Sequence, residues 1–433
     1  MTFLDAPAAA APTSVPAIPA GPRRPGRFTG DTRAYWRLLI RGGVLLAVTL
    51  GIYRFWFATD VRRFLWSHSE LDSDSFEYTG TPIELLLGFL IAIALLVPFY
   101  LIFFLVTLSM GPAGEAASGL GFLILAYLGQ YAVYRARRYR LTRTVFRGVR
   151  FHQGGSAWRY AFCAIIWWAM ILLTLGLAYP FAQSRLERFK MRHTYFGNLQ
   201  GRFVGSGWRL LFRGLPMWLL VVGPLAFALM FALGTVDWNA VVRAASSASS
   251  EAEFVGQLGS EFANLYVAGV VAIVATAASV AMAALLFPAF QAMVLRWWVT
   301  GVRFGALTAR SQLRTRTIYA AYGRFLLYGV LFLLAAAIVA AIGIGVFHIA
   351  FSANASSSDA EIAGAVGAVA LYVVVMLGFS TIYQGTAKLA LWRHGVESLE
   401  LEGLEVLDKV KADGAPSSAV GEGLADALNV GGI

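Results

Sequence analysis

The sequence predicts an all-α fold, a polytopic bundle of transmembrane helices, and three observations lead to this prediction. Hydrophobic residues make up 58% of the 433 residues and charged residues only 14%, whereas about a quarter of a typical soluble domain is charged. The mean hydropathy is +0.66, and the apolar residues gather in eight stretches. This excess cannot be buried in one soluble core, so a soluble single-domain enzyme is excluded and a bilayer is expected to solvate much of the chain.

Each apolar stretch is a candidate helix, because a helix satisfies its own backbone hydrogen bonds inside lipid. A spanning helix needs about 20 apolar residues, and most of the stretches reach this length. The first is marginal because Arg41 and Arg54 shorten its uncharged part, and the third ends early at Arg135. The eight stretches cover residues 38–57, 83–108, 119–134, 160–182, 210–233, 262–295, 325–351 and 362–392.

The charges between the stretches predict their orientation. Arginine is abundant in segments 135–159, 183–213 and 296–324, which the positive-inside rule places in the cytoplasm. Segments 109–118, 234–261 and 352–361 are poor in basic residues and are expected outside. The net charge of +11 is therefore interpreted as an attraction to anionic lipid headgroups on the cytoplasmic side rather than to nucleic acid.

Stretches 38–57 and 160–182 have basic residues on both flanks, so a single crossing would leave one basic flank outside. We predict that these two are re-entrant or interfacial helices. The other six stretches then form three spanning hairpins, 83–134, 210–295 and 325–392, with both termini cytoplasmic. The alternative of eight spans, with some arginines translocated, stays open at this point.

The sequence repeats itself weakly. Thr-Leu-Gly occurs at 49–51 and 174–176, and His68 and His193 follow at the same distance. We expect a disordered N-terminal tail at 1–26, a membrane domain at 27–395 and a flexible C-terminal tail at 412–433. Within the membrane domain we place a first copy at about 27–134, a second at about 147–305 and a partial third at about 325–395.

The repeated unit is an apolar helix, a glycine or proline break, and then a basic and aromatic turn. Glycine permits unusual backbone angles, and proline removes a backbone donor and so kinks or ends a helix. The candidate pathway or hinge residues are Thr49, Gly51, Thr174, Gly176 and Pro180. Side chains with an apolar body and a polar tip suit the headgroup layer. The candidate headgroup contacts are Arg63, Arg138, Arg185, Arg188, His193 and Phe196.

Several short motifs occur in a fixed order. They read TLGIY at 49–53, FEYTG at 76–80, RGVRF at 147–151, LTLGLAYP at 173–180 and HTYFG at 193–197. In these motifs the chain resembles the YjgN-like family of bacterial inner-membrane proteins, which has no established activity, over about residues 27–395. The resemblance implies an inner-membrane location and a multi-pass architecture, and it brings no catalytic residues.

No constellation of residues supports an enzyme, a cofactor or a metal site, and we predict none of the three. No ionisable residue lies near the centre of an apolar stretch, which argues against ion-coupled transport. We therefore expect an integral membrane protein that transports or handles a small solute or a lipid. The alternative is a non-transporting scaffold whose arginine-rich cytoplasmic face binds anionic lipid or partner proteins. The solute and the oligomeric state stay open.

Overall fold

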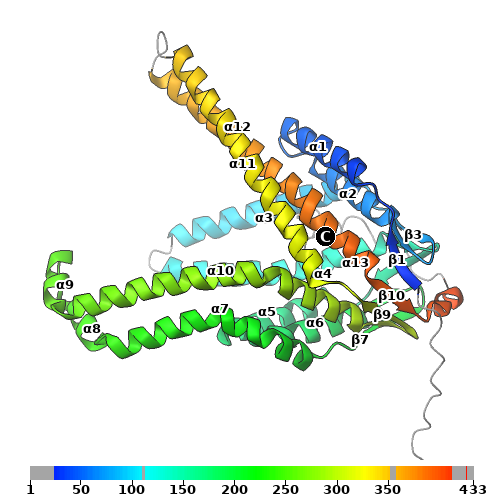
Figure 1. Cartoon of the computed structure of the whole chain (residues 1–433), viewed down its shortest axis with the longest axis horizontal. Coiled ribbons are helices and arrows are strands. Elements are labelled where there is room, and N and C mark those ends of the chain that lie inside the picture. The colour runs from blue at the N-terminus through cyan, green and yellow to red at the C-terminus, as the bar shows by residue number, and fades with distance from the viewer. Residues whose placement is uncertain (1–23, 110–112, 352–356, 412–425, 427–433) are drawn as a thin grey trace, which may run out of the picture.

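The computed structural model describes residues 24–109, 113–351, 357–411 and 426. It is mostly helical, as predicted, but ten short strands also form a closed antiparallel barrel. The all-α prediction is therefore incomplete. Figure 1 shows the strands gathered at one end of the molecule and the long helices running away from them.

The described chain forms five units, each with a helical hairpin between two short strands, and we number these units 1 to 5. Unit 1 holds β1 (Arg24–Phe28), α1 (Thr32–Val48), α2 (Arg54–Ser67) and β2 (Ser69–Leu71). Unit 2 holds β3 (Asp74–Tyr78), α3 (Pro82–Ser109), α4 (Ala113–Thr142) and β4 (Thr144–Phe146). Unit 3 holds β5 (Val149–Gln153), α5 (Ala157–Leu173), α6 (Tyr179–Arg192) and β6 (Thr194–Phe196).

The last two units contain additional helices. Unit 4 holds β7 (Leu199–Phe203), α7 (Gly207–Thr235), α8 (Trp238–Ser247), α9 (Glu251–Leu258), α10 (Glu261–Gly301) and β8 (Val302–Phe304). Unit 5 holds β9 (Leu307–Ser311), α11 (Thr315–Phe351), α12 (Ser357–Tyr383), a π-helix (Gln384–Lys388), α13 (Leu389–Glu397) and β10 (Leu399–Glu402). A short 3-10 helix, Leu404–Lys409, follows.

Two-residue turns join the last strand of each unit to the first strand of the next, and β10 pairs with β1 to close the barrel. In the turn between β4 and β5, Arg147 and Gly148 have φ of 48° and 74°, as two-residue hairpin turns require. The basic and aromatic turn predicted after Pro180 is therefore partly the helix α6 and partly the hairpin of β6 and β7. Strands of three to five residues are too short to show a clear alternation of apolar and polar residues, so the sequence did not predict them.

The barrel encloses an apolar cavity of about 280 Å³. Aromatic rings fill much of its wall, and the Phe151 and Phe196 rings lie 4.7 Å apart. Leu404 and Leu407 of the 3-10 helix also line the cavity. Because the segment after β10 contacts the turns at Arg147 and Gly197, it covers the turn end of the barrel.

Units 2, 4 and 5 carry long helical hairpins, and five of their helices are long and apolar enough to cross a membrane. These helices cover Pro82–Ser109, Gly207–Thr235, Glu261–Gly301, Thr315–Phe347 and Glu361–Glu397. Their large apolar side chains are mostly exposed, so an apolar medium must surround them. α4 packs beside α3 but is not among the five over the described residues, so the count of six spans stays a prediction.

Units 1 and 3 carry short hairpins. α1 and α5 have 17 residues each and are followed by turns, after which the chain returns to the barrel as α2 and α6. Stretches 38–57 and 160–182 therefore each contain the end of one helix, a turn and the start of the next. A helix of 17 residues is about 25 Å long, less than the roughly 30 Å hydrocarbon core. This is the path expected of a re-entrant segment.

The predicted tails and copies have different bounds in the structure. Arg24 to Gly26 belong to β1, so the predicted tail at 1–26 extends three residues too far, and the rest of it lies outside the described residues. In the predicted C-terminal tail, Asp426 is described and buried, whereas 412–425 and 427–433 lie outside the described residues. The units begin and end at strands, and the predicted copies at 27–134, 147–305 and 325–395 do not coincide with them.

Candidate functional site

The α1–α2 and α5–α6 hairpins each reverse direction in a turn, and the two turns have the same hydrogen-bond pattern. Thr49 Oγ1 donates to Leu45 O at 2.7 Å and accepts from Tyr53 N at 3.0 Å. Thr174 Oγ1 likewise donates to Met170 O at 2.7 Å, and Ala178 N donates to it at 3.0 Å. The threonines predicted as pathway or hinge residues therefore fix the end of the first helix and the start of the second.

The glycines complete these turns. Gly51 N donates to Leu46 O at 2.9 Å and Gly176 N to Ile171 O at 2.7 Å, the long-range bond of a Schellman helix end. Gly51 and Gly176 have φ of 94° and 95°, a region that favours glycine. The Thr-Leu-Gly sequence thus specifies a chain reversal at both sites.

A leucine at each tip is both strained and exposed. Leu50 and Leu175 have φ of 49°, which costs a non-glycine residue about 1 kcal/mol. Leu50 is 93% exposed and Leu175 is 70% exposed, so packing within the protein does not offset this strain. An outlier of this kind, found twice at equivalent positions, indicates a function for the tips.

An apolar crevice of about 360 Å³ lies between the α5–α6 tip and the α7 and α10 helices. Gly176 and Pro180 line it on one side, and Trp218, Phe287 and Phe290 line it on the other. Trp218 Nε1 donates to Leu175 O at 2.7 Å and ties the tip to α7. Pro180 lies in the first turn of α6, so it starts the returning helix rather than kinking a longer one.

Three of the predicted headgroup arginines donate to backbone carbonyls near the barrel. Arg63 Nη2 lies 3.0 Å from Gly80 O, and Arg188 Nη2 lies 3.2 Å from Gly205 O. Arg138 Nη2 donates to the carbonyl of Gly154 at 3.0 Å. These contacts brace the loops between strands and helices. Arg185 is exposed on α6, so it stays a candidate for contact with lipid headgroups.

His193 and Phe196 have structural positions. The Nδ1 of His193, at the end of α6, lies 2.7 Å from Phe189 O, and the two rings pack 4.6 Å apart. His68 ends α2 in the same way, against Phe64. Phe196 is 3% exposed inside the barrel. Its predicted contact with lipid headgroups does not fit this position, because strand alternation turns the ring inward.

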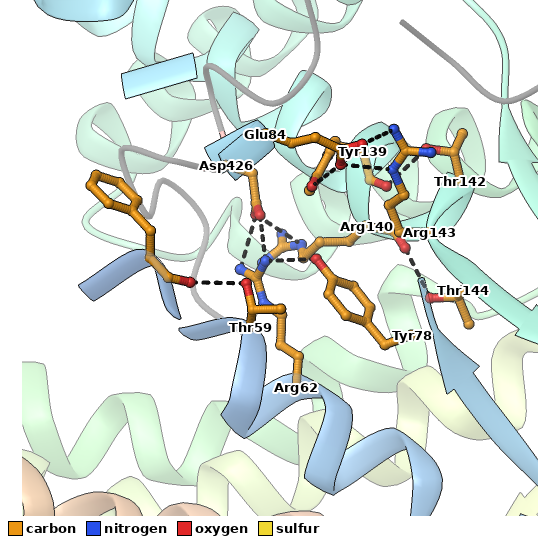
Figure 2. Close-up of polar contacts among 11 residues, drawn as sticks. Thr59, Arg62, Tyr78, Glu84, Tyr139, Arg140, Thr142, Arg143, Thr144 and Asp426 are labelled. Carbon is orange, nitrogen blue, oxygen red and sulfur yellow. Dashed lines mark hydrogen bonds and ion pairs between the residues drawn. The ribbon is translucent and has the colours of Figure 1, made fainter. Parts of the chain in front are cut away.

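A buried ion pair joins unit 1 to the C-terminal part of the chain, as Figure 2 shows. The Arg62 guanidinium of α2 donates twice to the Asp426 carboxylate, with Nη2 3.1 Å from Oδ1. The two side chains are 2% and 1% exposed. Arg62 Nη1 also donates to the Tyr78 hydroxyl at 3.1 Å. Arg140 of α4 approaches the same carboxylate at 3.7 Å.

A second buried group lies in unit 3. Glu187 of α6 is 7% exposed and pairs with Lys190 and, at 3.8 Å, with Arg137. Burial alone would raise the pKa of Glu187, but Lys190 and Arg137 hold the pKa below its ordinary value. Trp298 Nε1 donates to Glu187 at 3.0 Å and also lines the barrel cavity. This group therefore adjoins the barrel interior.

We call these charges the buried charge cluster. Six of its members lie on helices that return to the barrel, and the seventh, Asp426, comes after the last strand. The six are Arg62, Arg137, Arg140, Glu187, Lys190 and Lys388. Lys388 ends the π-helix, and π-helical turns are frequent at functional sites. No motif or spacing in the sequence predicted this cluster. The adjacent pair Arg62 and Arg63 was its one signal, since neighbours on a helix point in different directions.

A family model described as a bacterial protein of unknown function, DUF898, matches residues 23–427. This match covers all five units and confirms the resemblance found from the short motifs. No curated protein and no solved structure matches the chain.

Proposed function

We propose that this chain, which belongs to the DUF898 family of bacterial proteins of unknown function, is a multi-pass protein of the bacterial inner membrane that holds the acyl chain of a lipid. Five long apolar helices with exposed side chains support a place in a membrane. The proposal concerns handling of a lipid rather than passage of a hydrophilic solute.

The barrel is assigned to the cytoplasmic side. The arginine-rich segments 135–159, 183–213 and 296–324 all contain strands of the barrel, and basic segments favour the cytoplasm. The connection that holds α8 and α9 has more acidic than basic residues, and it lies at the far end of the α7 and α10 hairpin (Figure 1), as an external connection would. In this orientation both ends of the described chain are cytoplasmic.

The crevice beside α5 and α6 carries the proposal. Its volume of about 360 Å³ lies within the usual range for small-ligand pockets. Apolar side chains line it almost throughout, and a hydrocarbon chain gains about 25 cal/mol for each Å² it buries against them. A hydrophilic solute would leave its polar groups without partners there, which costs several kcal/mol. A second apolar crevice, of about 320 Å³, lies between α1 and the α11 and α12 helices.

A pair of neighbouring alanines on α10 provides the test. Both are exposed, but Ala283 lines the crevice and Ala284 does not. The A283F variant should fill the crevice, and A284F should leave it open. The full-length protein is reconstituted with a lipid that carries a photoreactive acyl chain, and cross-links are mapped by mass spectrometry. Cross-links to residues 176–180 and 214–218 should fall at least about fivefold in A283F and stay unchanged in A284F. Equal cross-linking in the two variants would contradict the proposal.

The scaffold hypothesis makes a different prediction. It places the affinity in exposed arginines such as Arg185 rather than in the crevice. Under it, R185Q would weaken binding to vesicles of phosphatidylglycerol, and A283F would not change any lipid interaction. Measuring both variants in the same assay separates the two functions.

A further inference from the structure

Arg62 is almost completely buried yet incompletely satisfied. Its side chain is 2% exposed, and among the described residues no partner accepts a hydrogen bond from its Nε. Burial alone would lower the pKa of Arg62, but Asp426 outweighs this effect and raises the pKa above its ordinary value, so the guanidinium keeps its charge. A buried cation with a spare donor indicates a site built for an anion.

The charges around Arg62 do not balance over the described residues. Asp426 is the carboxylate that both Arg62 and Arg140 approach. Lys388 is close enough for the charges of both arginines to act on it. The nearby Glu84 is already engaged by Arg143, at 2.9 Å. Two arginines therefore share one carboxylate, with the charge of Lys388 close by, and a ligand with more negative charge would match them better than an aspartate does.

We propose that the side chains of Arg62, Tyr78 and Arg140, which surround the Asp426 carboxylate, form a binding site for a phosphate group, and that Asp426 of the same chain occupies this site until a phosphate displaces it. The three side chains hold the donors that a phosphate needs. The Arg62 fork offers two Nη donors aimed at one point, and arginine binds phosphate and carboxylate in the same bidentate way. The Tyr78 hydroxyl, now an acceptor from Arg62, can donate to a phosphate oxygen by rotation.

Asp426 competes from within the molecule. It lies 364 residues away from Arg62 in sequence, and a tethered group acts at a high effective concentration. A free phosphate must overcome this competition, so the native chain should bind it weakly. The phosphate proposal does not rest on the lipid crevice, because Arg62, Tyr78 and Arg140 do not line that crevice. Failure of the A283F experiment would therefore leave the phosphate proposal intact.

The first experiment measures binding of inorganic phosphate by calorimetry to the full-length protein in a neutral detergent, with chloride as the ionic-strength control. D426N should bind phosphate about tenfold more tightly than the native protein, the scale of one charge-assisted hydrogen bond. Adding R62Q to D426N should abolish the gain. D408N changes an exposed carboxylate in the same part of the chain and should behave as the native protein, whereas D426N carrying R37Q should bind phosphate as tightly as D426N alone. If D426N binds phosphate no better than D408N, the proposal is wrong.

Two further arms identify the source of the phosphate and guard against misfolding. Phosphatidic acid in mixed micelles should displace phosphate from D426N if the ligand is a lipid headgroup, and a soluble phosphate is indicated if it does not. In the native protein, hydrogen exchange of the peptide containing Asp426 should rise when phosphate is added, and R62Q should remove this response. Unchanged exchange at saturating phosphate, together with no binding by D426N, would show that the pair is a structural ion pair alone.

Discussion

The strained leucines at the hairpin tips provide a test whose sign depends on the surroundings of the tip. Leu50 and Leu175 are exposed and adopt φ of 49°. Asparagine and aspartate tolerate this conformation far better than leucine does. If the tips lay in water, L50D and L175D would therefore stabilise the protein by about 1 kcal/mol.

We predict that L50D and L175D destabilise the protein, because both tips are proposed to lie in lipid. Moving from leucine to aspartate in the hydrocarbon region costs roughly 3 kcal/mol on an insertion scale. Relief of the strain returns about 1 kcal/mol. The net destabilisation should therefore be about 2 kcal/mol for each tip. The stabilities of L50N and L175N should lie between those of the aspartate variants and that of the native protein.

The assay is reversible unfolding of bilayer-reconstituted protein by an anionic detergent, followed by circular dichroism. V242D is the control, because Val242 is 65% exposed on α8, which is proposed to lie outside the membrane. It should change the stability little, because valine and aspartate have nearly equal helix propensities. A stabilising effect of L175D would refute the insertion of the tip into lipid.

Three further predictions concern the parts that hold the tips in place. F196A should cost about 3–5 kcal/mol of stability, since it removes a buried ring from the barrel, and calorimetry showing no change would return Phe196 to the headgroup candidates. The pKa of Glu187 is held below its ordinary value of 4.5, so its contribution is present above pH 4.5 and is lost as the pH falls through the folded pKa. The melting temperature should therefore drop on acidification, and less so in E187Q. G42A should cost about 1–3 kcal/mol, since a Cβ there would lie 2.1 Å from the Phe57 ring, and F57A should largely suppress this cost.

The sequence predicts the helical parts of this fold well for a physical reason. Long apolar stretches have few ways to satisfy their backbone in lipid, and the Thr-Leu-Gly motif identifies the reversals at Gly51 and Gly176. The basic flanks of the two short hairpins are a second, independent indication that the chain reverses there. Local sequence and charge together therefore specify the path of the chain through units 1 and 3.

The barrel and the buried charge cluster depend on contacts between distant residues. Strands such as Thr194–Phe196 are too short to show a period, so Phe196 resembles an interfacial aromatic residue until its neighbours are known. Arg62 meets Asp426 across most of the chain; the neighbouring Arg63 is the one local mark of Arg62, and no local pattern marks Asp426. The two-residue turns, for example Arg147 and Gly148, were the one local signal of the strands.

The central claim is that the α5–α6 hairpin enters and leaves on the same side of the membrane, and one labelling experiment tests it directly. Single cysteines replace Gly154, just before α5, and Asn198, just after β6, in a chain whose exposed Cys163 is changed to serine. Ser246 on α8 is the control for the external side. A membrane-impermeant thiol reagent should label both 154 and 198 only in inside-out vesicles, and 246 only in right-side-out vesicles. Labelling of 154 and 198 from opposite sides would show a crossing and contradict the account.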